Sequence, residues 1–203
     1  MPERLPRISL REVREWVSDF TPTSALRYDL SWTYQTQRGR VRGIAAVQLA
    51  PPDSIRFDYR GPFGRSGAAV VIGDSVLWSE PEEDIENLIP VARLFWGALG
   101  IVPEPPRGVA LTGGVIGESR VWRHAEGGEV FTYLAAPGER RSLKVEMSQR
   151  GTVVGTVDVQ FEVASRVPAR ATMVFPRAAT VFAITVEKVE ELQGIDPGIW
   201  REP

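Results

Sequence analysis

The segment LRYDLSWTYQ, residues Leu26–Gln35, decides the fold class of this chain. Every second side chain from Leu26 to Tyr34 is apolar or aromatic, and the side chains between them are Arg, Asp, Ser and Thr. Successive side chains of a β-strand point to opposite faces of a sheet, so a period of two is typical of a half-buried strand. We therefore predict a strand here, with its aromatic face turned towards the core.

The same alternation recurs after this strand. It resumes beyond the turn signal Arg38-Gly39, and it returns on both sides of the turn dipeptide Gly73-Asp74. Consecutive alternating runs joined by short turns favour antiparallel hairpins. The expected strands occupy residues 41–49, residues 54–60 and two short stretches within 67–79.

The second half of the chain repeats the pattern. The glycine-rich LTGGVIGES, residues 111–119, matches no phosphate-binding loop, and we interpret it as a strand broken by turns. The further strand-like runs are residues 119–126, 129–136, 140–148, 151–164, 168–175 and 179–189. The expected dry face of the fourth run consists of Val153, Val157, Val159, Phe161 and Val163. These runs predict a mainly β chain with a single, strongly curved antiparallel half-barrel sheet, because a long flat sheet would expose edges that aggregate.

Two helical segments are expected to cover this sheet. The first, at about residues 9–20, begins at Ser9, and Glu12 completes a capping box. The second begins near Ser79 in the acidic stretch SEPEED, and Pro90 is expected to kink or break it. The second helix and the segment that follows Pro90 are the expected lid or plug helices, at about residues 80–102.

The segment LIPVARLFWGALGIV, residues Leu88–Val102, carries a single charge, Arg93. A membrane-spanning helix needs about 20 apolar residues, so this segment is too short to be one. It is apolar on nearly every side and requires enclosure by other elements, for which we expect the concave face of the sheet. Two interpretations stay open at this point: permanent core, or a lid or plug that exchanges with an apolar ligand.

Length and composition limit the classes of function. The 203 residues suit one domain, 1–203, with a Pro/Gly-rich tail at about 194–203 that Trp200 is expected to pin to the body. A formal net charge of −2 argues against a nucleic-acid binder. The first residues contain no apolar segment of a signal peptide, which fits a cytoplasmic protein and equally an exported one without its leader.

The sequence offers no catalytic or metal-binding constellation. It contains one histidine, His124, no cysteine and no Gly-x-Ser-x-Gly motif, so no nucleophile can be nominated. A metal site would need a cage built mostly of carboxylates. We predict no catalytic residue, no metal and no cofactor, and we interpret His124 as structural or solvent-facing.

Residues 55–105 resemble the central region of the LolA/LolB superfamily of bacterial lipoprotein carriers, and LolB, the outer-membrane receptor, is the closer member. The family pattern is a strand with an aromatic or aliphatic pair, then Asn-Pro-Leu-Gly, two short strands, a helix, and a second helix that opens with Ile-Pro and ends Gly-x-Pro. The matching positions are Phe57–Tyr59, Gly61–Gly64, Ile89–Pro90 and Gly100–Pro103. The resemblance covers residues 40–105 in motif detail.

This resemblance implies a helix-covered half-barrel that holds acyl chains in a hydrophobic cavity, in the periplasm or anchored at the outer membrane. The exposed leucine of the family loop corresponds to Phe63, for which it implies membrane contact. Two features depart from the pattern. Ala50 stands before Pro51, where LolA-like carriers have a basic residue that helps to hold the lid shut, and the lipid-modified cysteine of an anchored receptor is missing.

The function predicted from these observations is non-enzymatic binding and transfer of lipoprotein acyl chains or another lipid in the bacterial cell envelope. The expected partners are acyl chains, a membrane surface and a carrier protein, with no nucleic acid, and the chain is expected to be a monomer. The alternatives are a structural or assembly subunit with a self-filled core, and an enzyme that acts on a lipid. The predicted lining of the cavity and lid is Tyr28, Leu30, Trp32, Phe57, Tyr59, Leu94, Phe95, Trp96, Leu99, Val145, Phe161 and Met173.

Overall fold

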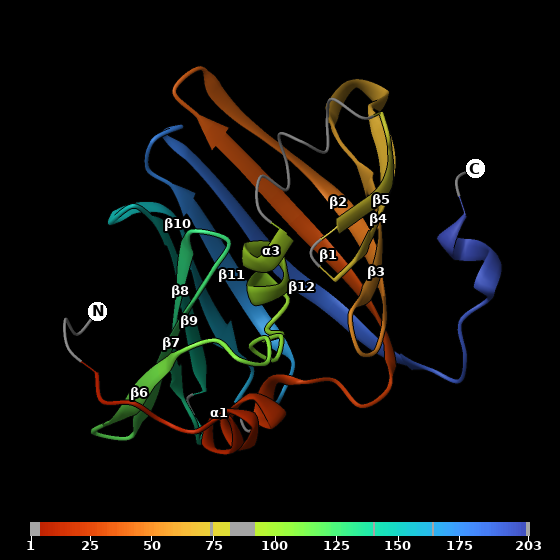
Figure 1. The fold of residues 1–203 in the computed structure, drawn as a ribbon. Coiled ribbons are helices and arrows are strands. Elements are labelled where there is room, and N and C mark those ends of the chain that lie inside the picture. The colour runs from red at the N-terminus through yellow and green to blue at the C-terminus, as the bar shows by residue number, and fades with distance from the viewer. Residues whose placement is uncertain (1–4, 74, 82–91, 140, 164, 202–203) are drawn as a thin grey trace.

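The computed structural model describes residues 5–73, 75–81, 92–139, 141–163 and 165–201, and these form a single sheet of twelve antiparallel strands with helices on its concave side and at one end (Figure 1). The strand order is β5-β4-β3-β2-β1-β12-β11-β10-β9-β8-β7-β6. The first and last strands pair at the centre, so the two halves of the chain form the two wings of the sheet. The strands are β1 (Ala25–Thr36), β2 (Gly39–Ala50), β3 (Ser54–Arg60), β4 (Ser66–Ile72), β5 (Ser75–Glu80), β6 (Leu111–Ile116), β7 (Ser119–Glu126), β8 (Glu129–Ala136), β9 (Ser142–Gln149), β10 (Thr152–Phe161), β11 (Pro168–Phe175) and β12 (Thr180–Leu192). The predicted mainly β fold with one curved antiparallel sheet is confirmed.

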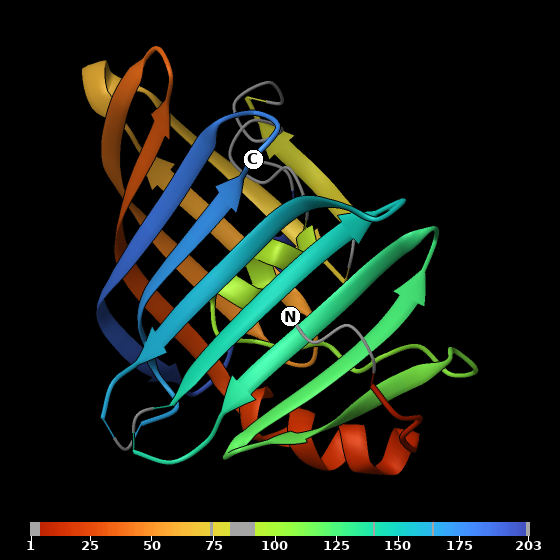
Figure 2. The same cartoon turned by 90° about the vertical axis from the view of Figure 1, so that its left-hand side faces the viewer.

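The sheet curls around the short helix α3 (Ala92–Ala98), which lies on the concave side between the two wings (Figure 2). Register shifts occur at Asp29/Leu30 in β1, at Val70/Val71 in β4 and at two places in β10. A register shift of this kind bends a strand and increases its twist. The shifts occur in both wings, which accounts for a half-barrel in place of a flat sheet.

The first predicted helix is confirmed. Helix α1 (Leu10–Val17) begins after Ser9, whose hydroxyl accepts a hydrogen bond from the backbone N–H of Glu12, while the Glu12 carboxylate accepts from the Ser9 hydroxyl and backbone N–H. These hydrogen bonds, to the Ser9 side chain first and its backbone second, lower the pKa of Glu12. Val13 and Val17 are buried beneath the helix, and the short turn η1 (Ser18–Phe20) continues it. Together they cover one end of the sheet.

No helix begins at Ser79 itself, so the N-cap predicted there is wrong. Ser79 and Glu80 belong to β5, where they pair with Ala69 and Ala68 of β4. The ladder of the hairpin therefore outweighs the local N-cap signal, since each further strand residue satisfies backbone groups that a cap would leave to the helix. Pro90 and the rest of the acidic stretch lie outside the described residues. A helix does follow Pro90, because α3 occupies Ala92–Ala98.

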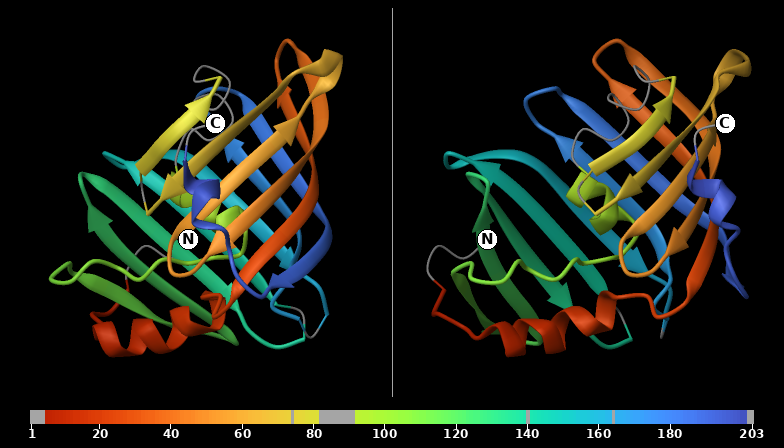
Figure 3. Two further views of the ribbon diagram at one scale, coloured as in Figure 1. Left: turned by 90° about the vertical axis from the view of Figure 1, so that its right-hand side faces the viewer. Right: turned by 45° about the vertical axis from the view of Figure 1, so that its right-hand side comes forward.

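Both chain ends return to the sheet. The N-terminal segment runs along β6, where Ile8 donates to the Leu111 carbonyl and Gly113 donates to the Pro6 carbonyl. At the other wing, the turn η3 (Pro197–Trp200) lies against the convex side near β3–β5 (Figure 3). Its attachment is through the backbone, because the indole of Trp78 donates to the carbonyl of Trp200 at 2.9 Å. The tail is pinned as predicted, although the Trp200 carbonyl makes this bond.

Two residues of the predicted dry face of 151–164 lie elsewhere. Strand β10 ends at Phe161, and Val163 beyond it is 77% exposed. The register shift between Val153 and Gly155 turns Val153 to the face of its partner Ser148, so that Val154 packs against the core in its place. Val157, Val159 and Phe161 are buried on the inner side of the strand. The alternation in the sequence continues to Val163, beyond the last residue pair of the ladder. Past that pair, strand geometry no longer turns alternate side chains inwards.

Candidate functional site

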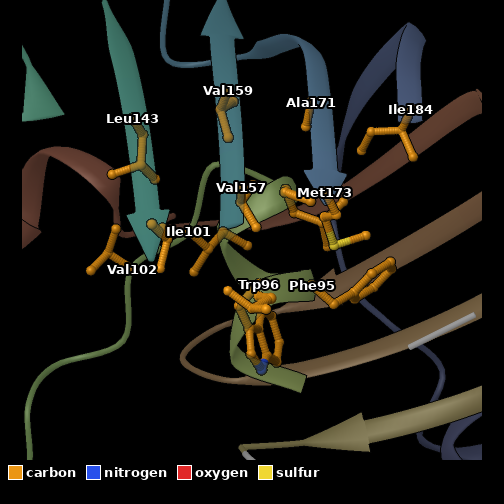
Figure 4. Packing of buried hydrophobic residues seen from close by; sticks show 14 of the residues in the cluster. Phe95, Trp96, Ile101, Val102, Leu143, Val157, Val159, Ala171, Met173 and Ile184 are labelled. Carbon is orange, nitrogen blue, oxygen red and sulfur yellow. The ribbon is translucent and has the colours of Figure 1, made fainter. Parts of the chain in front are cut away.

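The predicted lining residues come together in one place. All twelve belong to a single buried cluster that occupies the concave side of the sheet, which we call the interior. Each of them is at most 8% exposed. Figure 4 shows Val157 and Met173 of the sheet on one side of α3 and Trp96 pointing away from them. The two wings and the helix thus share one apolar interior, as the alternation predicts.

Helix α3 seats on the sheet through two glycines. A Cβ atom on Gly97 would lie 3.0 Å from Cγ2 of Val145, and one on Gly155 would lie 2.6 Å from Cδ1 of Leu94. Real Cβ contacts are seldom so short, so the helix approaches β9 and β10 more closely than any larger residue permits at these positions. The signal for this contact in the sequence is Gly155, which interrupts the apolar set of β10.

Aromatic rings connect α3 to the opposite wing. The ring of Phe95 meets that of Phe57 edge-on, with centroids 5.6 Å apart, and Phe57 stacks on Tyr59. The indole N–H of Trp96 donates to the Gly73 carbonyl in the turn between β4 and β5 at 2.7 Å. Helix α3 therefore contacts both wings, and its largest side chains point towards β3 and β4.

The one charge of the apolar segment is satisfied inside the molecule. The Arg93 side chain is 10% exposed and pairs with the carboxylate of Glu126, and its guanidinium carbon lies 4.8 Å from the centre of the Phe131 ring. Its Nη1 is 3.2 Å from Nε2 of His124. A buried charge requires such a partner, but the sequence could not say which acidic residue supplies it.

His124 is a packing residue of the interior. It is 2% exposed and stacks on Phe131 and Tyr133. A guanidinium can only donate, so Nε2 of His124 accepts from Arg93 when the ring proton is on Nδ1. The structural interpretation of His124 is confirmed, and the solvent-facing alternative is wrong.

The contacts of Arg93 join α3 to β7, so a polar attachment between the helix and the sheet starts from the helix. Only the fold brings Arg93 and Glu126 together.

One end of the interior is closed by α1 and η1. The rings of Phe20 and Phe161 lie 5.8 Å apart there, and the guanidinium of Arg141 sits over Phe20. A small cavity of about 210 Å³ remains beside Tyr28 and Leu99. Burial raises the pKa of Tyr28 to about 12, because the ionised phenolate would lose its hydration.

The opposite end is open. A cavity of about 570 Å³ lies between the β1–β2 hairpin and the loop after β3. Its lining is Trp32, Tyr34, Thr36, Arg38, Gly39, Arg40, Val41, Tyr59, Gly61, Pro62 and Arg65. Trp32 and Tyr59 also belong to the interior, so the cavity borders the apolar cluster directly. Trp32 can lie flat against β2 because the neighbouring position is Gly43, where a Cβ would collide with the indole and with the Arg60 carbonyl.

A larger cavity of about 880 Å³ has a different character. Its lining includes the charged residues Arg27, Asp29, Asp58 and Glu187. In β1 these charges alternate with the buried residues, so they belong to the convex face. Acids and bases are mixed there, and this groove does not suit an acyl chain.

Phe63 lies at the open end, in the turn η2 (Pro62–Gly64) between β3 and β4. Its side chain is 99% exposed. Its backbone φ of 58° lies in the left-handed region, which costs a residue with a Cβ about 1–2 kcal/mol. The loop thus keeps a large apolar side chain in solvent and in a strained conformation, an arrangement that folding alone does not favour.

None of the helices in the described residues is long and apolar enough to cross a membrane. The part of the chain that the structure describes contains no group of three or more His, Cys, Asp or Glu side chains placed to hold a metal ion.

Comparison with solved structures identifies the architecture. A LolA superfamily protein from Nitrosomonas europaea superposes with a TM-score of 0.53 over 96% of this chain and 98% of its own, at 12% sequence identity. The chain has a LolA-like fold. A putative outer membrane lipoprotein-sorting protein domain from Vibrio parahaemolyticus gives the same TM-score over 94% of this chain and 95% of its own, at 10% identity.

The LolA-like fold agrees with the resemblance found in residues 40–105, and it extends that resemblance to nearly the whole chain. No protein-family model matches the sequence, and no curated protein matches it. At these identities the neighbours establish the fold alone. The closer kinship with LolB stays a prediction.

Proposed function

We propose that this protein binds acyl chains of a lipid or lipoprotein in its half-barrel and transfers them without covalent chemistry. The observation that carries the proposal is the position of the open cavity. It borders the apolar interior through Trp32 and Tyr59, and the short helix α3 packs in that interior against the inner side chains of the strands. An apolar ligand could replace α3 against the same surfaces.

The energetics suit an exchange of this kind. Burial of one large apolar side chain stabilises the folded state by about 1.5–3 kcal/mol, and an acyl chain would bury the same strand surfaces when α3 moves away. The difference between the two states would then depend on the few directional contacts of the helix, namely the Arg93 pair and the Trp96 hydrogen bond. Transfer between carriers requires only such differences in affinity.

The names of the structural neighbours support a place in the bacterial cell envelope. One neighbour is titled a LolA superfamily protein and the other a putative outer membrane lipoprotein-sorting protein domain. By analogy we propose a monomer that works at the periplasmic side of a membrane and exchanges its cargo with a carrier protein. A LolB-like receptor role is the finer form of this proposal.

The first test is native mass spectrometry of protein purified gently from a bacterial host, followed by organic extraction. Bound mass that extracts as phospholipid or as an acylated peptide is the expected result. A clean protein that also refuses an added fluorescent fatty acid would favour the second candidate, a structural subunit whose interior is permanently filled by α3. The burial of Leu94, at 0% exposure, is the observation on which that second candidate rests.

A disulfide can test whether α3 has to move. An ideal Cβ on Gly97 lies 3.6 Å from Cβ of Val145, and disulfides join Cβ atoms about 3.5–4.5 Å apart. The chain contains no cysteine, so the double variant Gly97→Cys/Val145→Cys would form one defined cross-link. We expect the oxidised form to lose uptake of a fluorescent fatty acid and the reduced form to regain it.

Val145→Cys alone, treated with the same oxidant, is the matched control and should keep its uptake. Equal uptake by the oxidised and reduced double variant would assign the ligand to the open cavity and remove α3 as a plug. Leu94→Asp and Phe95→Asp should alter the affinity for the fatty acid more than Val163→Asp, which changes an exposed site.

We further propose that Phe63 contacts the membrane during delivery. Its full exposure and its strained backbone support this role. Phe63→Glu should leave folding unchanged and impair transfer of the cargo to liposomes. Unchanged transfer would exclude Phe63 from the mechanism.

A further inference from the structure

Five arginines gather at the open end. Arg38, Arg40 and Arg42 come from the β1–β2 hairpin, and Arg60 and Arg65 flank the turn that carries Phe63. The hairpin tip and the turn lie side by side at one end of the sheet (Figure 3). All five residues are exposed. We call this set the arginine rim.

The arginine rim has no acidic counterpart in its own segments. Residues 36–52 and 59–73 contain these five arginines and no Asp or Glu, in a chain whose formal net charge is −2. Among the described residues, none of the five forms an ion pair, whereas Arg27, Arg56, Arg93 and Arg120 each do. Five exposed arginines without an ion pair among the described residues thus lie at one end of a mildly acidic protein.

Exposed apolar side chains accompany the arginines. Phe63 stands between Arg60 and Arg65, and Ile44, which pairs with Arg60 across the ladder, is 59% exposed. Arg38, Arg40 and Arg65 line the same cavity as Trp32 and Tyr34. Basic and apolar residues combined on one surface are typical of proteins that lie in the headgroup region of a bilayer.

We infer that the arginine rim docks the open end onto a bilayer that contains anionic phospholipids. Phe63 enters the boundary between headgroups and acyl chains, and the guanidinium groups are attracted by the net negative charge of the anionic headgroups. This orientation places the mouth of the 570 Å³ cavity, with its aromatic wall, against the lipid surface. The inference rests on the membrane contact proposed for Phe63 and adds the class of lipid that the surface selects.

The charge pattern distinguishes this surface from an apolar wedge alone. An arginine near an anionic surface strengthens binding about five-fold at moderate ionic strength, and the effect is screened by salt. A neutral bilayer offers no such gain, so Phe63 acts on both kinds of membrane whereas the arginines act on one. The two contributions can therefore be measured separately.

The experiment is co-sedimentation of the full chain with two kinds of vesicle, phosphatidylcholine alone and phosphatidylcholine mixed with phosphatidylglycerol. Arg40→Gln/Arg65→Gln should weaken binding to the mixed vesicles by about 25-fold and leave binding to the neutral vesicles unchanged. Phe63→Ser should weaken binding to both. Arg11→Gln/Arg166→Gln removes two arginines at the closed end and is the matched control, which should bind as the wild type does.

Three results would overturn the inference: equal binding of the wild type to both kinds of vesicle, equal losses in the two double variants, or tight binding of a single-stranded oligonucleotide without binding of mixed vesicles. Far-ultraviolet circular dichroism checks that each variant is folded. Uptake of a soluble fluorescent fatty acid is measured in parallel. A wild type that binds mixed vesicles but takes up no fatty acid would refute the carrier function and still support the docking surface.

Discussion

The two ends of the half-barrel are built from different residues and differ in how far they exclude water. At the closed end, Val13 and Val17 of α1 are fully buried, and Phe20 meets Phe161 beneath a cationic side chain. At the open end, a cavity borders the interior, Phe63 is fully exposed, and the arginine rim has no partner among the described residues. We therefore expect stability to be concentrated at the closed end, where the chain excludes water. The groups suited to binding lie at the open end.

The largest effect should come from the closed end. Phe161→Ala removes a ring that contacts Phe20 and leaves a cavity under η1, and such truncations lower the free energy of unfolding by about 3–5 kcal/mol. Urea denaturation measures it. Phe63→Ala, which truncates the same side chain at the open end, should change the free energy of unfolding little; comparable losses at both sites would break the comparison.

Alkaline pH should also act on the closed end. Tyr28 has a folded pKa of about 12 and an ordinary value of 10.0, so above pH 10 the unfolded chain loses this proton first. The contribution of the buried Tyr28 phenol to the free energy of unfolding is complete below pH 10 and is lost as the pH rises through 12. Two pKa units correspond to a loss of about 3 kcal/mol. Urea denaturation at a series of pH values measures how the free energy of unfolding changes with pH.

Tyr28→Phe should remove that part of the pH dependence. Tyr34→Phe at the open end retains Tyr28 and should preserve it. The same slope in the wild type and in Tyr28→Phe would show that the buried phenol is not its source.

The contact between α3 and β7 should rank next. Arg93→Met leaves Glu126 without its cation, and loss of a charged hydrogen bond of this kind costs about 2–3 kcal/mol. The variant should also exchange a fluorescent fatty acid faster than the wild type. Lys144→Met breaks an exposed pair with Asp158 and should cost less than about 1 kcal/mol. Equal losses in the free energy of unfolding for the two variants would mean that burial of the Arg93 pair adds nothing to stability.

The last change is at Gly43, behind the wall of the open cavity. A methyl group there collides with the Trp32 indole and the Arg60 carbonyl, so Gly43→Ala should lower the free energy of unfolding by about 1–3 kcal/mol and shift Trp32 fluorescence. Gly114→Ala is the matched strand control, because its Cβ would meet only Pro6 at 4.0 Å. An unchanged free energy of unfolding for Gly43→Ala would show that the Trp32 indole has room to move.

Local patterns in the sequence determined the elements and the inward faces. The alternation in Leu26–Gln35 predicted β1 and its buried aromatic side, and Ser9 with Glu12 predicted the start of α1. These signals succeed because the period of a strand and the geometry of a cap depend on residues close together in the chain. The twelve predicted lining residues share one buried cluster for the same reason.

Tertiary structure decided what depends on residues far apart. Ser79 became a strand residue because β4 was available to pair with it, and Arg93 found Glu126 and His124 on β7. Gly97 and Gly155 set how closely α3 approaches the sheet, and the arginine rim formed where two separate turns met. Strand pairing, close approach of helix and sheet, and the clustering of charges on a surface depend on distances between residues that are far apart in the sequence. These distances are set only when the sheet has formed and curved.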